Sequence, residues 1–383
     1  MASQKQCVCL FGWHRTDFVY EGSYSKRTWS DLVSRFGCLR VVVLSQNRRF
    51  AVQRNEKMIV FFCPDVSRAM FIGFCVVIGL ATRLRRGRVM NVASEPWTSG
   101  IGAVLLKLVA GVPFVAEIQG EIFRENVLDR RTAAPLARAL ATISTTFADG
   151  IRIVNLQSFE ELKPRHLRGR VFLVPPRCDL SAFNPKKYDQ VLTRLRFGNG
   201  DGALFVICYV GRISPEKGLI HLLRAYKHVA IEYPQSRLWI AGNGPDEEAM
   251  RAEAVRLSLG RNVRFLGWIP HGLLPDLLAA VDVVVIPSLS EGLPRVLIEA
   301  LAMSKPVIAS AVGGIKEVLF NGSNGFLVRP GSEMDLQDAL SRVIRNPAAL
   351  APLAENARVS AQRFGWDAGM RMWGNMIEEL WRR

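Results

Sequence analysis

The sequence predicts an α/β protein with two domains, each a parallel, doubly wound sheet covered by helices. Short apolar runs alternate with amphipathic stretches along most of the chain, and strands that alternate with helices form parallel sheets. The chain has 383 residues, 49% of them hydrophobic, which is enough for two domains of ordinary size.

The second predicted domain, residues 190–365, has the clearer pattern. A continuous apolar run of the kind found in buried parallel strands lies at 203–211, and further strands are expected at 237–242, 263–267, 283–288, 306–310 and 325–330. The amphipathic segments between and after them predict helices at 218–234, 246–259, 273–281, 294–304, 315–320 and 332–344.

The first predicted domain, residues 1–185, repeats this alternation at wider spacing. Its expected strands are "CVCLFG", "LRVVVLS", "KMIVFFC", "VMNVAS", "PFVAEIQG", "GIRIVN" and "VFLVPP", with helical patterns at 101–110 and 133–145. The domain boundary is expected near 179–190, and the amphipathic segment 366–383 is expected to pack back on the first domain. Two such domains that face a cleft would bind ligands at the carboxyl ends of their strands.

One apolar run, "AMFIGFCVVIGLAT" at 69–82, precedes the basic "RLRRGR". Its fourteen residues fall short of the roughly 20 that span a bilayer. Two interpretations stay open: a core helix with a solvated basic end, or a monotopic membrane contact.

Positive charge is concentrated in the first half of the chain. Residues 1–198 hold 30 Lys and Arg against 15 Asp and Glu, whereas the remainder holds 20 against 19. The basic half suits an anionic membrane surface or an anionic acceptor; the alternative is that these charges serve only solubility. Nucleic acid is not expected as a partner, because no recognised binding motif is present.

The seven cysteines have neither zinc-ligand nor CxxC spacing. Most lie in apolar runs, so buried free thiols in a reducing compartment are expected. No secretory signal pattern is evident. We therefore expect a cytoplasmic protein, and the charge argument extends this to peripheral attachment at the inner face of a membrane.

The stretch "EGLPRVLIEA" holds two carboxylates eight positions apart, Glu291 and Glu299. Pro294 favours the first position of a helix, which places Glu291 in the preceding loop and Glu299 little more than one turn inside. A helix N-terminus carries free N–H groups and partial positive charge. The stretch therefore predicts a ligand with a phosphate in its middle and hydroxyls at both ends.

Gly-rich turns follow several of the predicted strands. "VGRISPEKG" places Gly211, Arg212 and Lys217 after one strand, where two cations can neutralise a diphosphate; a solvated basic turn is the alternative. "AGNGP" adds Gly242 and Gly244, and "SAVGGIKEV" is a third such turn. Neither a GxGxxG fingerprint nor a GxxxxGK[ST] loop is present.

These motifs together resemble the C-terminal domain of retaining GT-B glycosyltransferases, the large glycosyltransferase family 4. The resemblance covers residues 205–345, including "FLGWIP", "VVVIPSLSEGLPRVLIEALAMSKPVIASAVGGIKEV" and "NGSNGFLVRPG". Weaker similarity lies in "AGVPFVAEIQGE" and "VPPRCDLSAFNP". The implied fold is GT-B, two Rossmann-like domains facing a cleft.

The resemblance also implies an activity: transfer of a sugar, with retention and without metal, from a UDP- or GDP-linked donor to a glycan or lipid-linked glycan. Arg212 and Lys217 would hold the diphosphate, Glu299 the ribose hydroxyls and Glu291 the donor sugar, with Arg212, Lys217 and Glu291 as the catalytic set. The implied donor site comprises Gly211, Arg212, Lys217, Gly242, Gly244, Glu291, Gly292, Leu293, Pro294, Arg295 and Glu299.

The sequence departs from the family on the acceptor side. Gln119, followed by Gly120, stands where the family has a histidine near the donor sugar, and the Gly-rich loop after the first strand is missing. The five histidines (His14, His166, His221, His228 and His271) fall outside that motif and are expected as surface or helix residues. These departures leave a second hypothesis open, a non-catalytic nucleotide-sugar-binding subunit of a glycan-assembly complex; the absent fingerprint disfavours a dinucleotide oxidoreductase.

Overall fold

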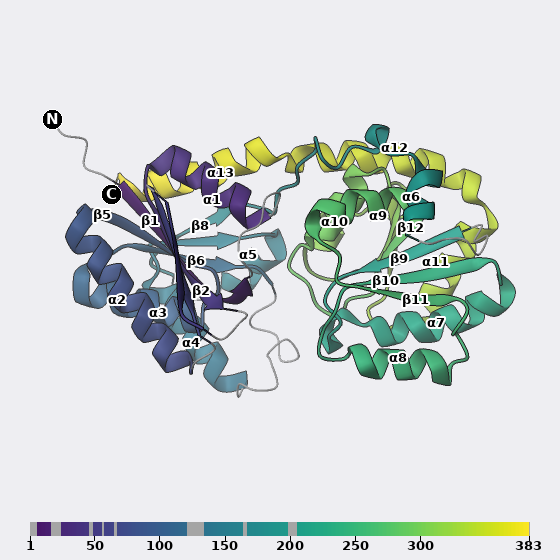
Figure 1. Cartoon of the computed structure of the whole chain (residues 1–383), viewed down its shortest axis with the longest axis horizontal. Coiled ribbons are helices and arrows are strands. Elements are labelled where there is room, and N and C mark those ends of the chain that lie inside the picture. Colours follow the sequence, from purple (N-terminus) through teal and green to yellow (C-terminus); the bar gives the residue numbers. More distant parts are fainter. Residues whose placement is uncertain are drawn as a thin grey trace. The chain divides into compact units, whose positions relative to one another are not determined.

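Strands and helices alternate along the chain in the computed structural model, which describes residues 6–16, 24–45, 49–55, 57–64, 67–120, 134–163, 167–197 and 205–382. They form two units (Figure 1): unit 1 is Met1–Pro175 with Met370–Arg383, and unit 2 is Pro176–Gly369. Residues 176–185, which the sequence analysis placed in the first domain, belong to unit 2. The backbone of Cys178 forms a β-bridge with Gly365, and Arg177 lies over the Trp366 ring.

The sheet of unit 1 has the strand order β3-β4-β2-β1-β5-β6-β7-β8. Its strands are β1 (Gln6–Thr16), β2 (Leu39–Ser45), β3 (Ala51–Arg54), β4 (Met58–Cys63), β5 (Arg88–Ala93), β6 (Phe114–Ile118), β7 (Gly150–Ile153) and β8 (Arg170–Leu173). All neighbouring strands pair in parallel except β3 and β4. Six of the seven residues of β2 and all five residues of β6 are buried. This is expected of strands that helices cover on both faces of the sheet.

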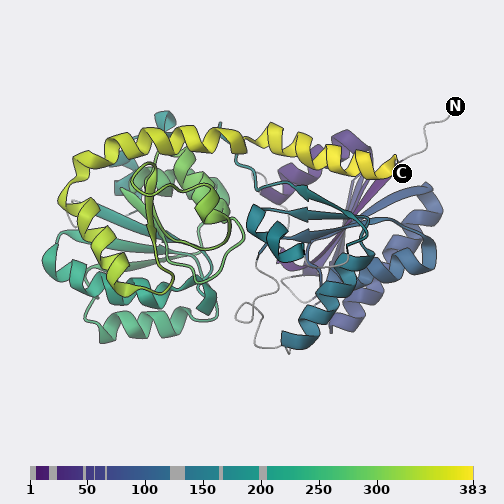
Figure 2. The same ribbon diagram turned by 180° about the vertical axis from the view of Figure 1, so that it is seen from behind.

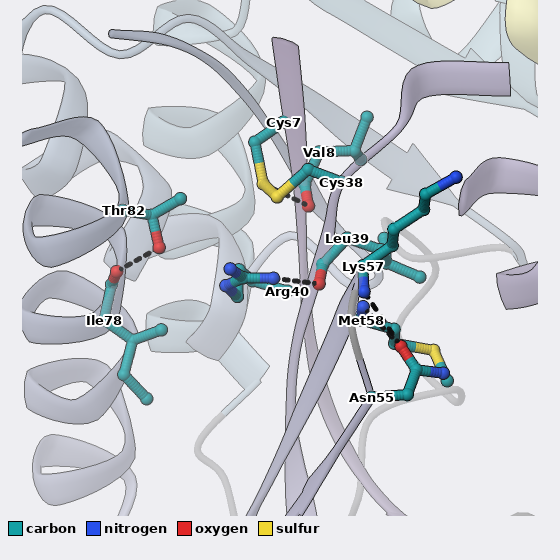
Figure 3. Close-up of a disulfide and its surroundings, with 10 residues drawn as sticks. All are labelled: Cys7, Val8, Cys38, Leu39, Arg40, Asn55, Lys57, Met58, Ile78 and Thr82. Carbon is teal, nitrogen blue, oxygen red and sulfur yellow. Dashed lines mark hydrogen bonds between the residues drawn. A yellow bond between two sulfur atoms is a disulfide. The ribbon is translucent and has the colours of Figure 1, made fainter. Parts of the chain in front are cut away.

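The antiparallel strand β3 departs from the predicted all-parallel sheet. A tight turn joins it to β4, in which the side-chain oxygen of Asn55 accepts hydrogen bonds from the backbone N–H groups of Lys57 and Met58 (Figure 3). A connection this short can only return the chain antiparallel, because a parallel neighbour needs a long crossover.

Two helical layers cover the sheet of unit 1 (Figures 1 and 2). Helices α2 (Arg68–Arg86), α3 (Thr98–Ala110) and α4 (Ala134–Phe147) lie on one face; α1 (Tyr24–Phe36) and the C-terminal part of α13 (Trp366–Trp381) lie on the other. The short helix α5 (Leu156–Leu162) follows β7. The predicted helix at 69–82 is part of α2, and its inner side buries Phe71 and Cys75. Among the described residues no helix has both the length and the apolarity to cross a membrane.

The cysteines do not all behave as expected. Cys7 and Cys38 form a disulfide (Figure 3), whereas the other five are free and buried. The prediction of seven free thiols is therefore wrong for this pair. The parallel register pairs Val8 with Leu39, so the two preceding cysteines lie opposite one another, with Cα atoms 4.5 Å apart. A separation of 31 residues along the chain gives no hint of this proximity.

The sheet of unit 2 is wholly parallel, with the strand order β11-β10-β9-β12-β13-β14. Its strands lie within one or two residues of most predicted positions: β9 (Phe205–Val210), β10 (Ser236–Ala241), β11 (Val263–Gly267), β12 (Val283–Ile286), β13 (Val307–Ser310) and β14 (Gly325–Val328). The carboxyl ends of parallel strands meet at one edge, so the loops after β9, β10, β12 and β13 emerge together there.

Helices pack on both faces of this second sheet. They are α6 (Gln190–Arg196), α7 (Leu219–Glu232), α8 (Glu247–Arg256), α9 (Leu274–Ala280), α10 (Arg295–Ala302), α11 (Glu333–Arg345) and α12 (Leu350–Ala361). The predicted helix at 315–320 is instead a short 3₁₀ turn at Gly313–Glu317. Figures 1 and 2 show α7, α8 and α11 on one face and α9, α10 and α12 on the other.

Candidate functional site

The two glutamates of "EGLPRVLIEA" flank the start of α10. The helix begins at Arg295, with Pro294 as its N-cap residue, one position earlier than predicted for the proline. Glu291 lies in the loop that follows β12, and Glu299 lies in the second turn with only 4% of its surface exposed. Both carboxylates therefore lie near a helix N-terminus, the end of a helix that favours an anion.

A charged network joins the loops after β9 and β12. The Lys217 ammonium donates to Oε1 of Glu291 at 2.6 Å, and the Ser288 hydroxyl donates to the same oxygen at 2.8 Å. The Lys217 and Glu291 side chains are 24% and 10% exposed. Because the carboxylate is buried, a cation and a hydroxyl are needed to offset the loss of its hydration.

Backbone contacts fix these loops against one another. The Leu289 N–H donates to the Glu216 carbonyl at 2.8 Å, and the Gly314 N–H donates to the Gly292 carbonyl at 2.6 Å. The first bond ties the turn that carries Lys217 to the loop that carries Glu291. The second ties the loop after β13 to the same segment, so three strand ends contribute to one site.

Arg212 is exposed at the end of β9. Its backbone carbonyl accepts a 2.6 Å hydrogen bond from the Tyr209 hydroxyl, and its guanidinium forms no ion pair among the described residues. Burial raises the pKa of Tyr209, and the nearby Glu291 and Glu216 carboxylates raise it further. Tyr209 therefore stays a neutral donor that holds the Arg212 backbone in place.

Gly242 and Gly244 have a structural reason to be glycine. A Cβ atom on either would collide with backbone, at the Gly211 carbonyl and at Ile213 respectively. The Ile213 N–H donates to the Asn243 carbonyl at 2.8 Å. These glycines let the loop after β10 lie against the loop after β9, which supports the backbone that carries Arg212.

His271 is a site residue that the sequence analysis missed. It lies in the 3₁₀ turn His271–Leu273, and its Nε2 lies 2.8 Å from Oε1 of the buried Glu299. The Phe183 ring packs against the imidazole at a centroid distance of 5.5 Å. Since 28 residues separate the histidine from the glutamate, no local spacing pattern connects them.

The remaining predicted residues of unit 2 lie in the same segment. Gly292 and Leu293 are buried, whereas Arg295 is exposed at the start of α10. Of the other histidines, His221 contacts Glu333 on α11 and His228 is an exposed residue of α7. His166, the side chain of His14 and residues 17–23 after β1 lie outside the described residues.

In unit 1, Gln119 and Gly120 follow β6. The Gln119 amide donates to Oε2 of Glu117 at 2.9 Å, and Arg152 pairs with Oε1 of the same carboxylate at 2.7 Å. Trp373 of α13 also donates to it. Burial opposes ionisation of Glu117, but the Arg152 charge and these hydrogen bonds outweigh burial and lower its pKa. Gln119 is itself exposed, and its amide borders a buried ion pair of Glu117 with Arg152 that stays charged at neutral pH.

The site of unit 2 combines features that suit a phosphorylated, hydroxyl-rich ligand. It offers the exposed arginines Arg212 and Arg295, the Lys217 ammonium, a helix N-terminus and two carboxylates held by separate partners. Cations and N–H groups bind phosphate oxygens, and ionised carboxylates accept hydrogen bonds from hydroxyls.

Comparison with known proteins gives a family match for part of the chain. Residues 196–360 match the family described as glycosyl transferases group 1. A D-inositol 3-phosphate glycosyltransferase of Actinosynnema mirum is 31% identical over 312 residues, which cover 76% of this chain and 72% of the relative. The protein of the same name from Rhodococcus jostii is 31% identical over 288 residues, covering 72% of this chain but only 63% of that relative.

Solved structures show the same fold. Sucrose-phosphate synthase of Thermosynechococcus elongatus matches with a TM-score of 0.83 at 22% identity, covering 98% of this chain and 99% of that one. HepE of Anabaena, solved in complex with UDP-glucose, matches with a TM-score of 0.77 at 19% identity, covering 98% of this chain and 100% of that one. The fold is GT-B, with two Rossmann-like domains, as the sequence predicts.

Proposed function

Since this chain belongs to the family of glycosyl transferases group 1, we propose that it transfers a sugar from a nucleotide-diphosphate-sugar donor to an acceptor. The observation that carries this proposal is the network of Lys217, Glu291 and Ser288 beside the N-terminus of α10. It sets a cation, a carboxylate and the first turn of a helix side by side, which matches a diphosphate joined to a sugar.

Each residue has a role in this proposal. Arg212 and Lys217 neutralise the diphosphate, assisted by the backbone at Gly292–Arg295. Lys217 and Ser288 both donate to Oε1 of Glu291, so Oε2 is left to accept a hydrogen bond from a hydroxyl of the donor sugar. Glu299 accepts the ribose hydroxyls, and His271 fixes its orientation.

The chemistry follows from these roles. As the bond between the anomeric carbon and the diphosphate breaks, negative charge grows on the diphosphate, and Arg212 and Lys217 stabilise that charge most in the transition state. The departing oxygen takes the proton of the attacking acceptor hydroxyl on the same face. The product then keeps the donor configuration, as expected of glycosyltransferase family 4, and no metal is required.

The relatives guide the choice of substrates. HepE was solved with UDP-glucose, so a UDP-linked sugar is the first donor to test, followed by a GDP-linked sugar. The sequence relatives are named for D-inositol 3-phosphate, a phosphorylated acceptor. A phosphorylated or lipid-linked glycan acceptor fits the positive charge of residues 1–198.

The experiment measures release of UDP or GDP by the purified chain from UDP-glucose, UDP-N-acetylglucosamine and GDP-mannose, with and without acceptors. We expect one donor to be turned over, with proton NMR showing retained anomeric configuration and with full activity in EDTA. Binding without turnover on any acceptor would favour the non-catalytic subunit. Failure of every nucleotide to bind would contradict the donor site itself.

A further inference from the structure

Helices α2, α3 and α4 cover one face of the sheet of unit 1, and each turns an apolar stripe away from that sheet. On α2 the outward positions are Met70, Gly73, Val77, Ala81 and Leu84, all exposed and three or four residues apart. That spacing places them on one side of the helix. A helix that covers a sheet normally turns polar residues to water, so this stripe needs an explanation.

The neighbouring helices continue the apolar surface. α2 packs against α3, and α3 against α4, so their outer sides adjoin (Figures 1 and 2). Leu108 and Val109 of α3 are 64% and 68% exposed, and Leu136 of α4 is 55% exposed. Leu84 on α2 is 86% exposed. Exposed apolar residues on three neighbouring helices indicate an interaction site.

The charges of the same three helices all have one sign. They contain six basic residues, Arg68, Arg83, Arg85, Arg86, Lys107 and Arg138, and no Asp or Glu; of these, Lys107 pairs with Asp149, which follows α4. Three of the arginines form the last turn of α2, where none pairs with a carboxylate among the described residues. By contrast, the opposite face has Asp31 on α1, and Glu378 and Glu379 on α13.

More positive charge lies beside the end of α2. Burial lowers the pKa of Arg40 on β2, and the nearby Arg86, Arg54 and Arg85 lower it further. These arginines therefore repel one another, and no carboxylate in the described part of the chain offsets the charge at Arg40. An anionic surface placed against the end of α2 would offset this repulsion.

We propose that the outer side of α2, α3 and α4, here called the α2–α4 face, docks on a bilayer that contains anionic lipid. The apolar stripes would enter the boundary between headgroups and acyl chains, and the arginines at the end of α2 would contact the headgroup charges. Two independent signals of this kind give stable but reversible attachment.

A second copy of the chain fits this face less well. A two-fold contact brings the same surface of both copies together. The α2–α4 face has no carboxylate to offer to the arginines of its partner, so the pairing would bury apolar surface while leaving the cations unrelieved. Anionic lipid supplies both the apolar and the negative component.

The test is co-sedimentation of the purified full chain with vesicles of phosphatidylcholine, with and without phosphatidylglycerol, at low and high salt. We expect binding only to vesicles with phosphatidylglycerol, and weaker binding at high salt. Changing Arg83, Arg85 and Arg86 to Ser should lower the partition coefficient on the order of a hundredfold, at roughly fivefold per arginine. Changing Val77, Leu84 and Val109 to Gln should lower it about tenfold or more.

Matched control variants come from unit 2. Ile231, Val255 and Val359 are 73%, 75% and 64% exposed, and their change to Gln removes comparable apolar surface elsewhere. Changing Arg251, Arg256 and Arg345 to Ser removes the same net charge. Both controls should bind vesicles like the unchanged chain.

Three results would overturn the inference. One is no binding to either kind of vesicle. The second is that the charge control and the Arg83, Arg85 and Arg86 variant lose vesicle binding to the same extent, which would indicate attraction by net charge alone. The third is a dimer in analytical ultracentrifugation that the Val77, Leu84 and Val109 variant abolishes, which would assign the face to a second copy. The inference does not depend on the proposed function. Calorimetry of nucleotide binding in the same variants tests the donor site, whereas vesicle binding tests the α2–α4 face.

Discussion

Replacing Glu299 by Gln gives the sharpest test of the donor site. The side chain keeps its shape but loses its charge, and one of its two acceptor oxygens becomes an amide donor. Glu299 is 4% exposed, and its Oε1 faces His271 at 2.8 Å. If the carboxylate accepts two ribose hydroxyls, the change removes one charge-assisted bond, worth about 1.5–3 kcal/mol. We expect the Kd for the nucleotide to rise about tenfold to a hundredfold.

Isothermal titration calorimetry with UDP and with GDP measures this change, after thermal melting has shown that the variant is folded. The matched control is Glu333→Gln, because Glu333 also contacts a histidine, His221, at 3.4 Å in the same unit, but belongs to no predicted site. It should leave the affinity unchanged. Equal affinity of Glu299→Gln and the unchanged chain for every nucleotide would refute the placement of the ribose.

Three further predictions concern other parts of the molecule. Arg212→Ala should lower kcat about 10²–10³-fold and raise KM much less, because the charge it stabilises grows in the transition state; steady-state kinetics with varied donor checks this, and an unchanged kcat would exclude the role. Arg152→Met should destabilise the protein by about 3–5 kcal/mol in urea, since it leaves Glu117 buried without its cation. The pKa of Glu117 is lowered in the folded protein, so its contribution to stability is complete above its unfolded pKa of about 4.3 and is lost as the pH falls through its folded pKa. The difference in stability between the wild type and Arg152→Met should therefore shrink in acid, and a difference that stayed constant would contradict this. Cys7→Ser should lower the free energy of unfolding by about 3–4 kcal/mol, from the loop closed by a separation of 31 residues, and titration of the denatured, unreduced wild type should give five thiols, not seven.

Local signals in the sequence predicted the sheet of unit 2 well. Strands β9 and β12 are continuous apolar runs, and Pro294 indicates where α10 begins within one residue. The position of Glu291 in a loop and of Glu299 inside the helix follows from that single proline. These features depend on neighbours in the chain, which periodicity and turn chemistry report.

Contacts between distant segments could not be predicted in this way. The pairing of Lys217 with Glu291 spans 74 residues, and it depends on which strands are neighbours in the sheet. The disulfide of Cys7 with Cys38 depends on the register of β1 against β2, and the contact of His271 with Glu299 joins a turn to a helix 28 residues away. Helix α12 was missed for another reason: Pro352 interrupts its pattern, yet it is tolerated because it lies in the first turn.

The path of the chain through α13 has a consequence for synthesis. Residues 370–383 belong to unit 1, although all of unit 2 precedes them. Among them, Trp373, Ile377 and Leu380 are buried, and the indole N–H of Trp373 donates a hydrogen bond to the Glu117 carboxylate. During translation, unit 2 can therefore finish folding while unit 1 still lacks one covering helix. Until that helix emerges from the ribosome, the sheet of unit 1 exposes apolar surface, so this half of the protein is the one that would need a chaperone.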